Sequence, residues 1–228
     1  DFDNDRDVDI FHATGQFTFP LIVRRKGVRN IKEKYSFYEY PVFYERSEIG
    51  TTPFFRWDAS KIGFEATDGR GAAGIDYDND GYREIALAVS GGEYRLYDVA
   101  MAGNNALQID LQSGPNGTAL GARVAVTAGG ETQYRYHNAR TDYLSQDSRV
   151  IHVGLGNFTR ADVTVTWPDG TTQTFRNVAA GQRLVITRAG IVDRIQLSES
   201  SIPTRATESS PARRVLTPLP PSRRTGST

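Results

Sequence analysis

The chain of 228 residues is 38% hydrophobic and 11% aromatic, and its 27 basic residues balance its 27 acidic ones. Zero net charge gives no overall attraction to nucleic acid, and the absence of cysteine excludes disulfides, thiolate metal sites and cysteine nucleophiles. No apolar run approaches the ~20 residues of a membrane span, and no signal peptide is visible, so localisation must be inferred from the type of domain.

The first nine residues carry an aspartate at every second position. These aspartates are Asp1, Asp3, Asp5, Asp7 and Asp9, and apolar residues typical of a strand follow them. Such crowding of like charges is costly in a folded loop unless a bound cation offsets the repulsion. The sixth position holds an arginine, where a sharp turn prefers glycine. The pattern indicates a cation-binding loop, with a solvated acidic turn as the alternative.

An aromatic segment occupies residues 35–44, after a cluster of basic residues between positions 24 and 34. Aromatic side chains favour strands and bury much apolar surface, so we interpret the segment as strand and core. Exposed aromatic rings also stack on sugars, which leaves a carbohydrate-binding role as the alternative. The basic cluster is interpreted as a solvated face, with an acidic polysaccharide as its alternative ligand.

A second acidic loop, at residues 76–84, repeats the spacing of the first. Its carboxylates are Asp76, Asp78, Asp80 and Glu84, at positions 1, 3, 5 and 9 of the loop, and an apolar run follows them. Two copies of one spacing, each followed by an apolar strand, argue against a chance pattern.

The spacing of both loops matches the oxygen chemistry of Ca²⁺. This hard cation takes six to eight oxygen ligands at about 2.3–2.6 Å, and a tight loop turns alternate side chains toward one point. Position 7 would add its backbone carbonyl to the carboxylates. We therefore expect one Ca²⁺ at Asp76, Asp78, Asp80, the Tyr82 carbonyl and Glu84, and a second at Asp1, Asp3, Asp5, the Asp7 carbonyl and Asp9.

Residues 102–190 show the alternation that is typical of half-buried strands. Apolar and polar residues alternate at 107–112 and at 123–127, and Gly129-Gly130 is a hairpin signal between two strand-like runs. Alternation implies one buried and one solvated face, so we expect an antiparallel β-sandwich or barrel. No stretch has a convincing helical period, and the whole chain is predicted to be all-β.

Residues 191–228 are interpreted as a linker and a disordered tail. The part from residue 198 onward is rich in Ser, Thr, Pro and Arg, and it holds too few apolar side chains to offset the entropy of ordering it. The sequence thus predicts a first domain at residues 1–101, a second at 102–190 and a tail.

Residues 69–81, which lead into and include most of the second acidic loop, resemble the FG-GAP/VCBS repeat of integrin-α-like β-propellers. In that family each blade carries a calcium loop within a hairpin. The resemblance implies that residues 1–101 are parts of propeller blades, although Glu84 stands where the repeat usually has Asp. A propeller typically needs four to eight blades, so the resemblance also implies further blades upstream, which this chain lacks.

A second resemblance covers residues 104–188 and rests on four motifs in a fixed order. The motifs are Gly121-Ala122-Arg123-Val124, Tyr143-Leu144-Ser145-Gln146, His152-Val153-Gly154-Leu155-Gly156 and Trp167-Pro168-Asp169-Gly170. They resemble the ASPIC/UnbV domain, which follows FG-GAP repeats in secreted proteins. The resemblance implies an extracellular or cell-surface location, with the periplasm as the alternative.

The sequence favours a binding role over catalysis. His152 is interpreted as a structural histidine, and no Gly-x-Ser-x-Gly elbow accompanies Ser145. We expect a non-enzymatic, calcium-binding extracellular module for adhesion, interaction or scaffolding, with a protein or glycan ligand, no nucleic-acid partner and no membrane span. The alternatives are a carbohydrate-binding module that uses residues 35–44, and the non-catalytic C-terminal part of a secreted hydrolase.

Overall fold

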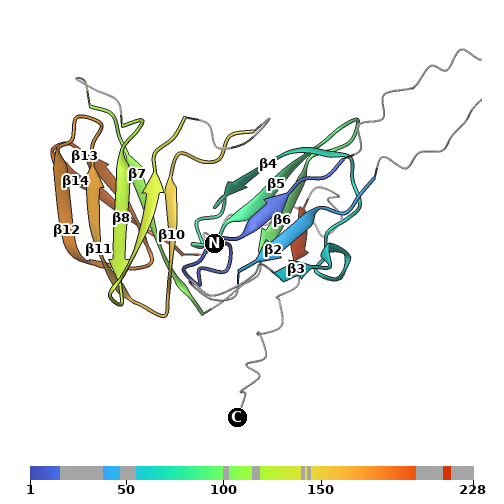
Figure 1. Ribbon diagram of the computed structural model, residues 1–228, viewed down its shortest axis with the longest axis horizontal. Helices are drawn as coiled ribbons and strands as arrows, with labels where there is room; N and C mark the ends of the chain where they lie inside the picture. The colour runs from blue at the N-terminus through green and yellow to red at the C-terminus, as the bar shows by residue number, and fades with distance from the viewer. Residues whose placement is uncertain are drawn as a thin grey trace, which may run out of the picture.

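The computed structural model describes residues 1–15, 38–46, 55–99, 103–114, 119–139, 142, 145–198 and 213–216. In these residues the chain forms four β-sheets and one short 3₁₀-helix, η1 (Ala59–Lys61), which confirms the all-β prediction. Figure 1 shows two groups of sheets side by side, with the N-terminus at their junction. No helix within the described residues is long and apolar enough to span a membrane.

The first group contains two sheets, and each acidic loop leads into a strand of one of them. In the sheet of order β1-β2-β3, the first loop precedes β1 (Ile10–His12), which pairs with β2 (Val42–Glu45), and β2 pairs with β3 (Phe55–Trp57). In the sheet of order β15-β6-β5-β4, the second loop connects β4 (Gly69–Ile75) to β5 (Glu84–Val89). The same sheet continues from β5 to β6 (Arg95–Val99), and β6 pairs in parallel with the edge strand β15 (Arg213–Leu216).

Aromatic side chains from both sheets share the core of this group. Phe43 of the predicted aromatic segment is 3% exposed, and its ring meets that of Phe2 edge to face with centroids 4.5 Å apart. The core interpretation is therefore confirmed for Phe43. Tyr38 and Tyr40 are exposed instead, and residues 35–37 lie outside the described part of the chain.

The second group is a β-sandwich of two four-stranded sheets, of order β10-β7-β13-β14 and β12-β11-β8-β9. Its strands are β7 (Asn105–Leu111), β8 (Arg123–Ala128), β9 (Glu131–Tyr136), β10 (Ile151–Gly156), β11 (Arg160–Thr166), β12 (Thr172–Ala179), β13 (Gln182–Thr187) and β14 (Gly190–Gln196). The predicted alternation of buried and solvated side chains is present in β8, where Val124 and Val126 are buried in one core with Leu184. The pair β7–β13 is parallel, and the other pairs within the sandwich are antiparallel.

The structure corrects the predicted end of the second domain. The sequence placed a linker from residue 191, whereas β14 occupies Gly190–Gln196 and pairs with β13 along its whole length. Most side chains of β14 are exposed, so its sequence gives little sign of a strand. Backbone hydrogen bonds to β13 hold it in the sheet. Of the predicted disordered tail, residues 213–216 form β15, and the remainder of 199–228 lies outside the described residues.

Candidate metal centre

The two acidic loops share one backbone conformation. Counting positions from Asp1 and from Asp76, position 4 holds Asn4 and Asn79, with φ of 60° and 62°. Position 6 holds Arg6 and Gly81, both with φ of 92°. These left-handed angles are free for glycine and cost other residues about 1–2 kcal/mol. Agreement at both positions shows that the loops are structural repeats.

The loops also share their internal hydrogen bonds. The position-5 N–H donates to the position-3 carboxylate at 3.2 Å in both copies. The position-7 N–H donates to the position-5 carboxylate at 3.0 Å in the first loop and 2.7 Å in the second. The position-2 N–H donates to the position-9 carboxylate at 3.0 Å in both. Short aspartate-to-backbone bonds of this kind fix a turn, so the side chains themselves organise each loop.

Three carboxylates converge in each loop, with ligand atoms within 4.8 Å of one another. The two triads are Asp1, Asp3 and Asp5 in the first loop, and Asp76, Asp78 and Glu84 in the second. Two predicted carboxylate ligands lie outside these triads. Asp9 accepts from the N–H groups of Phe2 and Arg46 at 3.0 and 3.2 Å, and Asp80 accepts from that of Tyr82 at 2.7 Å.

Several buried carboxylate oxygens in the loops lack a hydrogen-bond partner. Glu84 is 0% exposed and its Oε1 is unpartnered, as are Oδ1 of Asp76 and of Asp1. Asp7 is 4% exposed and neither of its oxygens is paired. Burying an ionised carboxylate without a partner is costly, so these oxygens fit a bound cation. The sequence had assigned Asp7 a role only through its carbonyl and missed its carboxylate.

Burial changes the protonation of these acids. Desolvation, reinforced by repulsion from the other acids of the loop, raises the pKa of Glu84 to about 9. The same causes raise the pKa of Asp3 and of Asp7 to about 7, and that of Asp80 to about 6. A cation among the carboxylates would favour their ionised forms and reverse these shifts.

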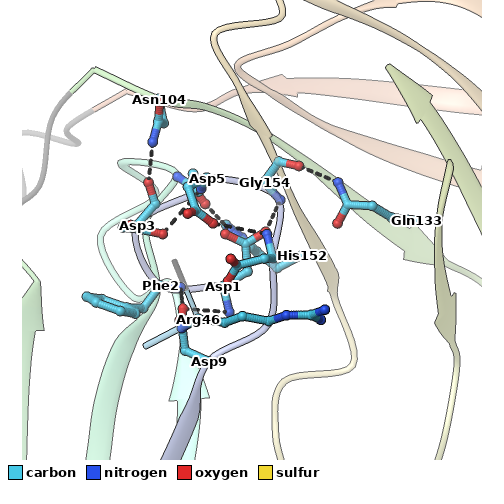
Figure 2. Close-up of polar contacts among 12 residues, drawn as sticks. Asp1, Phe2, Asp3, Asp5, Asp9, Arg46, Asn104, Gln133, His152 and Gly154 are labelled. Atoms are coloured by element: carbon cyan, nitrogen blue, oxygen red, sulfur yellow. Dashed lines mark hydrogen bonds and ion pairs between the residues drawn. The ribbon is translucent and has the colours of Figure 1, made fainter. Parts of the chain in front are cut away.

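The first loop is held against the sandwich, as Figure 2 shows. The side-chain amide of Asn104 donates to the Asp3 carbonyl at 2.9 Å. From β10, the N–H of Gly154 donates to Oδ2 of Asp1 at 3.0 Å. The loop thus receives partners from a region that the sequence analysis treated as a separate domain.

The position-6 arginine has a role of its own at this junction. The Arg6 guanidinium donates to the Ala128 carbonyl at 2.9 Å and to Oε2 of Glu131 at 2.8 Å, and it lies 4.9 Å from the centre of the Phe158 ring. These contacts with the sandwich offset the cost of its left-handed backbone. The departure from glycine therefore joins the loop to its neighbour and leaves the loop conformation intact.

The second loop also contacts the sandwich at this junction. The Gln108 amide of β7 donates to Oδ2 of Asp76, and the Arg183 guanidinium of β13 donates to Oδ1 of Asn79 at 2.7 Å. Both contacts come from the inner strands of one sheet of the sandwich. Neither residue was a candidate in the sequence, because only the docking of the two groups brings them to the loop.

A cavity of about 270 Å³ lies between the two loops. Asp1 and Asp9 line it from the first loop, Arg83 and Glu84 from the second, and Phe11 contributes apolar wall. The cavity therefore brings acidic residues of both loops to one space.

His152 and Ser145, which were weighed as catalytic candidates, and the nearby Asp147 have structural partners at this junction. Asp147 forms an ion pair of 2.8 Å with Arg83, and the Ser145 hydroxyl donates to a backbone carbonyl of β4. Nε2 of His152 lies 2.7 Å from Oδ1 of Asn4. Burial depresses the pKa of His152 well below its usual value, so the ring is neutral at physiological pH. This geometry agrees with a structural role for the histidine.

Comparison with known proteins identifies relatives of part of the chain. Residues 112–192 match the family model described as ASPIC and UnbV. This range lies largely within the predicted 104–188 and covers the sandwich from the residue after β7 into β14. The FG-GAP/VCBS resemblance of residues 1–101 stays a prediction.

Cartilage acidic protein 1 is similar to the chain in two vertebrates. The Xenopus tropicalis protein is 29% identical over 191 residues, which is 80% of this chain and 26% of the relative. The human protein is 32% identical over 122 residues, which is 50% of this chain and 18% of the relative. The chain therefore spans about a quarter or less of these relatives, and its similarity to the Xenopus protein extends beyond the sandwich into the region of the acidic loops.

Proposed function

We propose that this chain is a calcium-stabilised extracellular module in which two bound Ca²⁺ ions order the acidic loops where the two groups of sheets meet. The proposal rests above all on Glu84, a fully buried carboxylate that has an unpartnered oxygen and whose ligand atom lies within 4.8 Å of those of Asp76 and Asp78. The first loop supports it independently, since it repeats the same backbone angles and internal hydrogen bonds.

The donor set favours calcium over other divalent cations. All candidate ligands are carboxylate or carbonyl oxygens, which suit hard cations. Calcium accepts six to eight oxygens in irregular geometry, whereas Mg²⁺ demands a near-octahedral shell at about 2.0–2.1 Å and keeps several waters. A loop in which backbone N–H groups already restrain most of the carboxylates suits the more tolerant ion.

An extracellular location is part of the same proposal. Calcium-binding modules that work outside cells typically have dissociation constants for Ca²⁺ of about 10⁻⁴–10⁻³ M. The name of the relatives, cartilage acidic protein 1, supports a role in an extracellular setting. We propose that the module presents its exposed surfaces to a protein or glycan ligand and that calcium keeps it rigid.

Calcium titration calorimetry of the metal-free full chain tests the proposal. We expect two calcium ions per chain, with Asp78→Ala removing one and Asp3→Ala the other. Glu93→Ala is the matched control, since its exposed carboxylate lies in the same group of sheets outside the loops. Calcium at 100 times its dissociation constant should stabilise the fold by about 2.7 kcal/mol. No bound calcium in the wild-type chain would refute the proposal.

A second candidate function is carbohydrate binding beside the aromatic segment. The exposed rings of Tyr38 and Tyr40 line a cavity of about 430 Å³, whose polar lining includes the Glu65–Arg95 ion pair at 3.4 Å. Aromatic faces next to paired polar groups suit a sugar ring. Glycan-array binding that Tyr40→Ala abolishes, and that Tyr134→Ala on the sandwich leaves intact, would establish it. Equal binding by both variants would reject this site.

A further inference from the structure

We infer that the sandwich completes the calcium site of the second loop, with Gln108 and Arg183 as positioning residues that couple cation affinity to the docking of the two groups of sheets. The inference rests on the proposed calcium function and extends it to a part of the chain outside the loops. Three observations support it. They are the orientation of the Gln108 amide, the two hydrogen bonds donated by Arg183, and a similar contact between the sandwich and the position-1 aspartate of the first loop.

Gln108 has a buried side-chain amide whose nitrogen and oxygen both form hydrogen bonds. It lies on β7 with 1% of its surface exposed, and its Nε2 donates to Oδ2 of Asp76. Its Oε1 accepts from Nε of Arg183 at 2.7 Å. Because the guanidinium can only donate, it fixes which end of the amide faces which partner, and the NH₂ group must face the aspartate.

Arg183 holds the glutamine and the loop at the same time. It lies beside Gln108 in the parallel pairing of β13 with β7. While its Nε donates to Gln108, a terminal nitrogen donates to Oδ1 of Asn79 at 2.7 Å. Asn79 is one of the two residues of the loop with a left-handed backbone. One rigid guanidinium fork therefore positions both the first ligand and the turn of the site.

These bonds leave one oxygen of Asp76 for the cation. Oδ2 accepts from Gln108 and from the N–H of Gly81 at 3.1 Å, whereas Oδ1 is buried and unpartnered. The first loop repeats this division, since Oδ2 of Asp1 accepts from Gly154 of the sandwich and its Oδ1 is unpartnered. In both loops the sandwich anchors one oxygen of the position-1 aspartate, which orients the other oxygen as a ligand.

Positioning and simple electrostatics predict opposite effects of changing Arg183. If the guanidinium acts only as a positive charge near the acidic loop, Arg183→Gln should tighten calcium binding and Arg183→Lys should leave it unchanged. If it acts by positioning, both variants should weaken binding, because neither side chain has the planar guanidinium fork whose Nε and terminal nitrogen hold Gln108 and Asn79. Loss of such outer partners typically costs about 10–100-fold in metal affinity.

The test is calcium titration of the full chain, with the two sites assigned through Asp78→Ala and Asp3→Ala. We expect Gln108→Leu, Arg183→Lys and Arg183→Gln to weaken the second-loop site about 10–100-fold and to leave the first-loop site unchanged. Gln112→Leu and Arg176→Gln, at exposed positions of the same sandwich, should match the wild type. Circular dichroism in chelator checks folding, and Arg183→Lys keeps the test valid if Gln108→Leu does not fold.

Hydrogen exchange gives a second measurement that does not depend on the affinity itself. Since coupling is reciprocal, calcium should slow amide exchange in β7 and β13 of the wild type, and Arg183→Lys should lose most of that protection. Calcium binding with unchanged affinity in all three variants would overturn this inference alone. Absence of calcium binding in the wild type would overturn it together with the proposed function.

Discussion

Glu84→Gln should change stability in opposite directions with and without calcium. The pKa of Glu84 is raised from 4.5 to about 9, so the metal-free native chain binds a proton that the unfolded chain releases above pH 4.5. Its contribution is therefore fully present below pH 4.5 and is lost as pH rises toward about 9. In chelator, the wild type should become less stable between pH 5 and pH 8.

The magnitude follows from the size of the shift. At pH 8, keeping Glu84 protonated in the native chain, while the unfolded chain releases this proton, costs about 4–5 kcal/mol at full strength. Solvent around the half-buried neighbouring acids and relaxation of the loop reduce this to about 2–3 kcal/mol. In the wild type, Oε2 of Glu84 accepts from the N–H of Tyr77 at 3.0 Å, and the amide oxygen of a glutamine can accept the same hydrogen bond. The glutamine has no carboxyl group that must stay protonated or be buried with a charge.

Denaturant titrations at pH 5 and pH 8, in chelator and in excess calcium, measure the effect. Without calcium at pH 8, Glu84→Gln should be more stable than the wild type by about 2–3 kcal/mol. In calcium it should be the less stable of the two, because the carboxylate ligand is gone. Glu93→Gln, at an exposed position, should behave as wild type throughout. A wild-type chain whose stability in chelator rises from pH 5 to pH 8 and equals that of Glu84→Gln would refute the reasoning.

Three further substitutions test the loops and the sandwich by chemical denaturation in calcium. Asn4→Ala should cost about 2–4 kcal/mol, because it removes a left-handed asparagine and leaves His152 and the Gly81 carbonyl without their hydrogen bonds; a cost below 0.5 kcal/mol would contradict the packed junction. Gly81→Ala should cost about 1–2 kcal/mol through backbone strain at φ 92° and should weaken calcium binding, whereas unchanged stability would mean that the turn relaxes. Leu184→Ala, at 0% exposure, should cost about 2–5 kcal/mol of stability and leave calcium affinity unchanged. A loss of calcium affinity as large as the loss of stability would contradict a sandwich core that is separate from the loops.

Local patterns in the sequence were sufficient for many of the strands and for the shape of the acidic loops. Val124 and Val126 alternate with polar neighbours, and burial follows that period because successive side chains of a strand point to opposite faces. The repeated aspartate spacing predicted two similar loops, because an aspartate side chain accepts a hydrogen bond from the backbone N–H two residues later. The strand β14 was missed because backbone pairing, which composition does not record, holds its exposed side chains in place.

The spacing of its acids by itself determined where this protein concentrates negative charge and which carboxylates gather in each loop. The tertiary structure alone decided what surrounds those acids, since Gln108 and Arg183 lie far from Asp76 along the chain and meet the loop only through the packing of the sandwich. It also decided that Arg6 stabilises the junction. The physical reason is that spacing sets the geometry within a turn, whereas burial and hydrogen bonding depend on which distant strands pack against it.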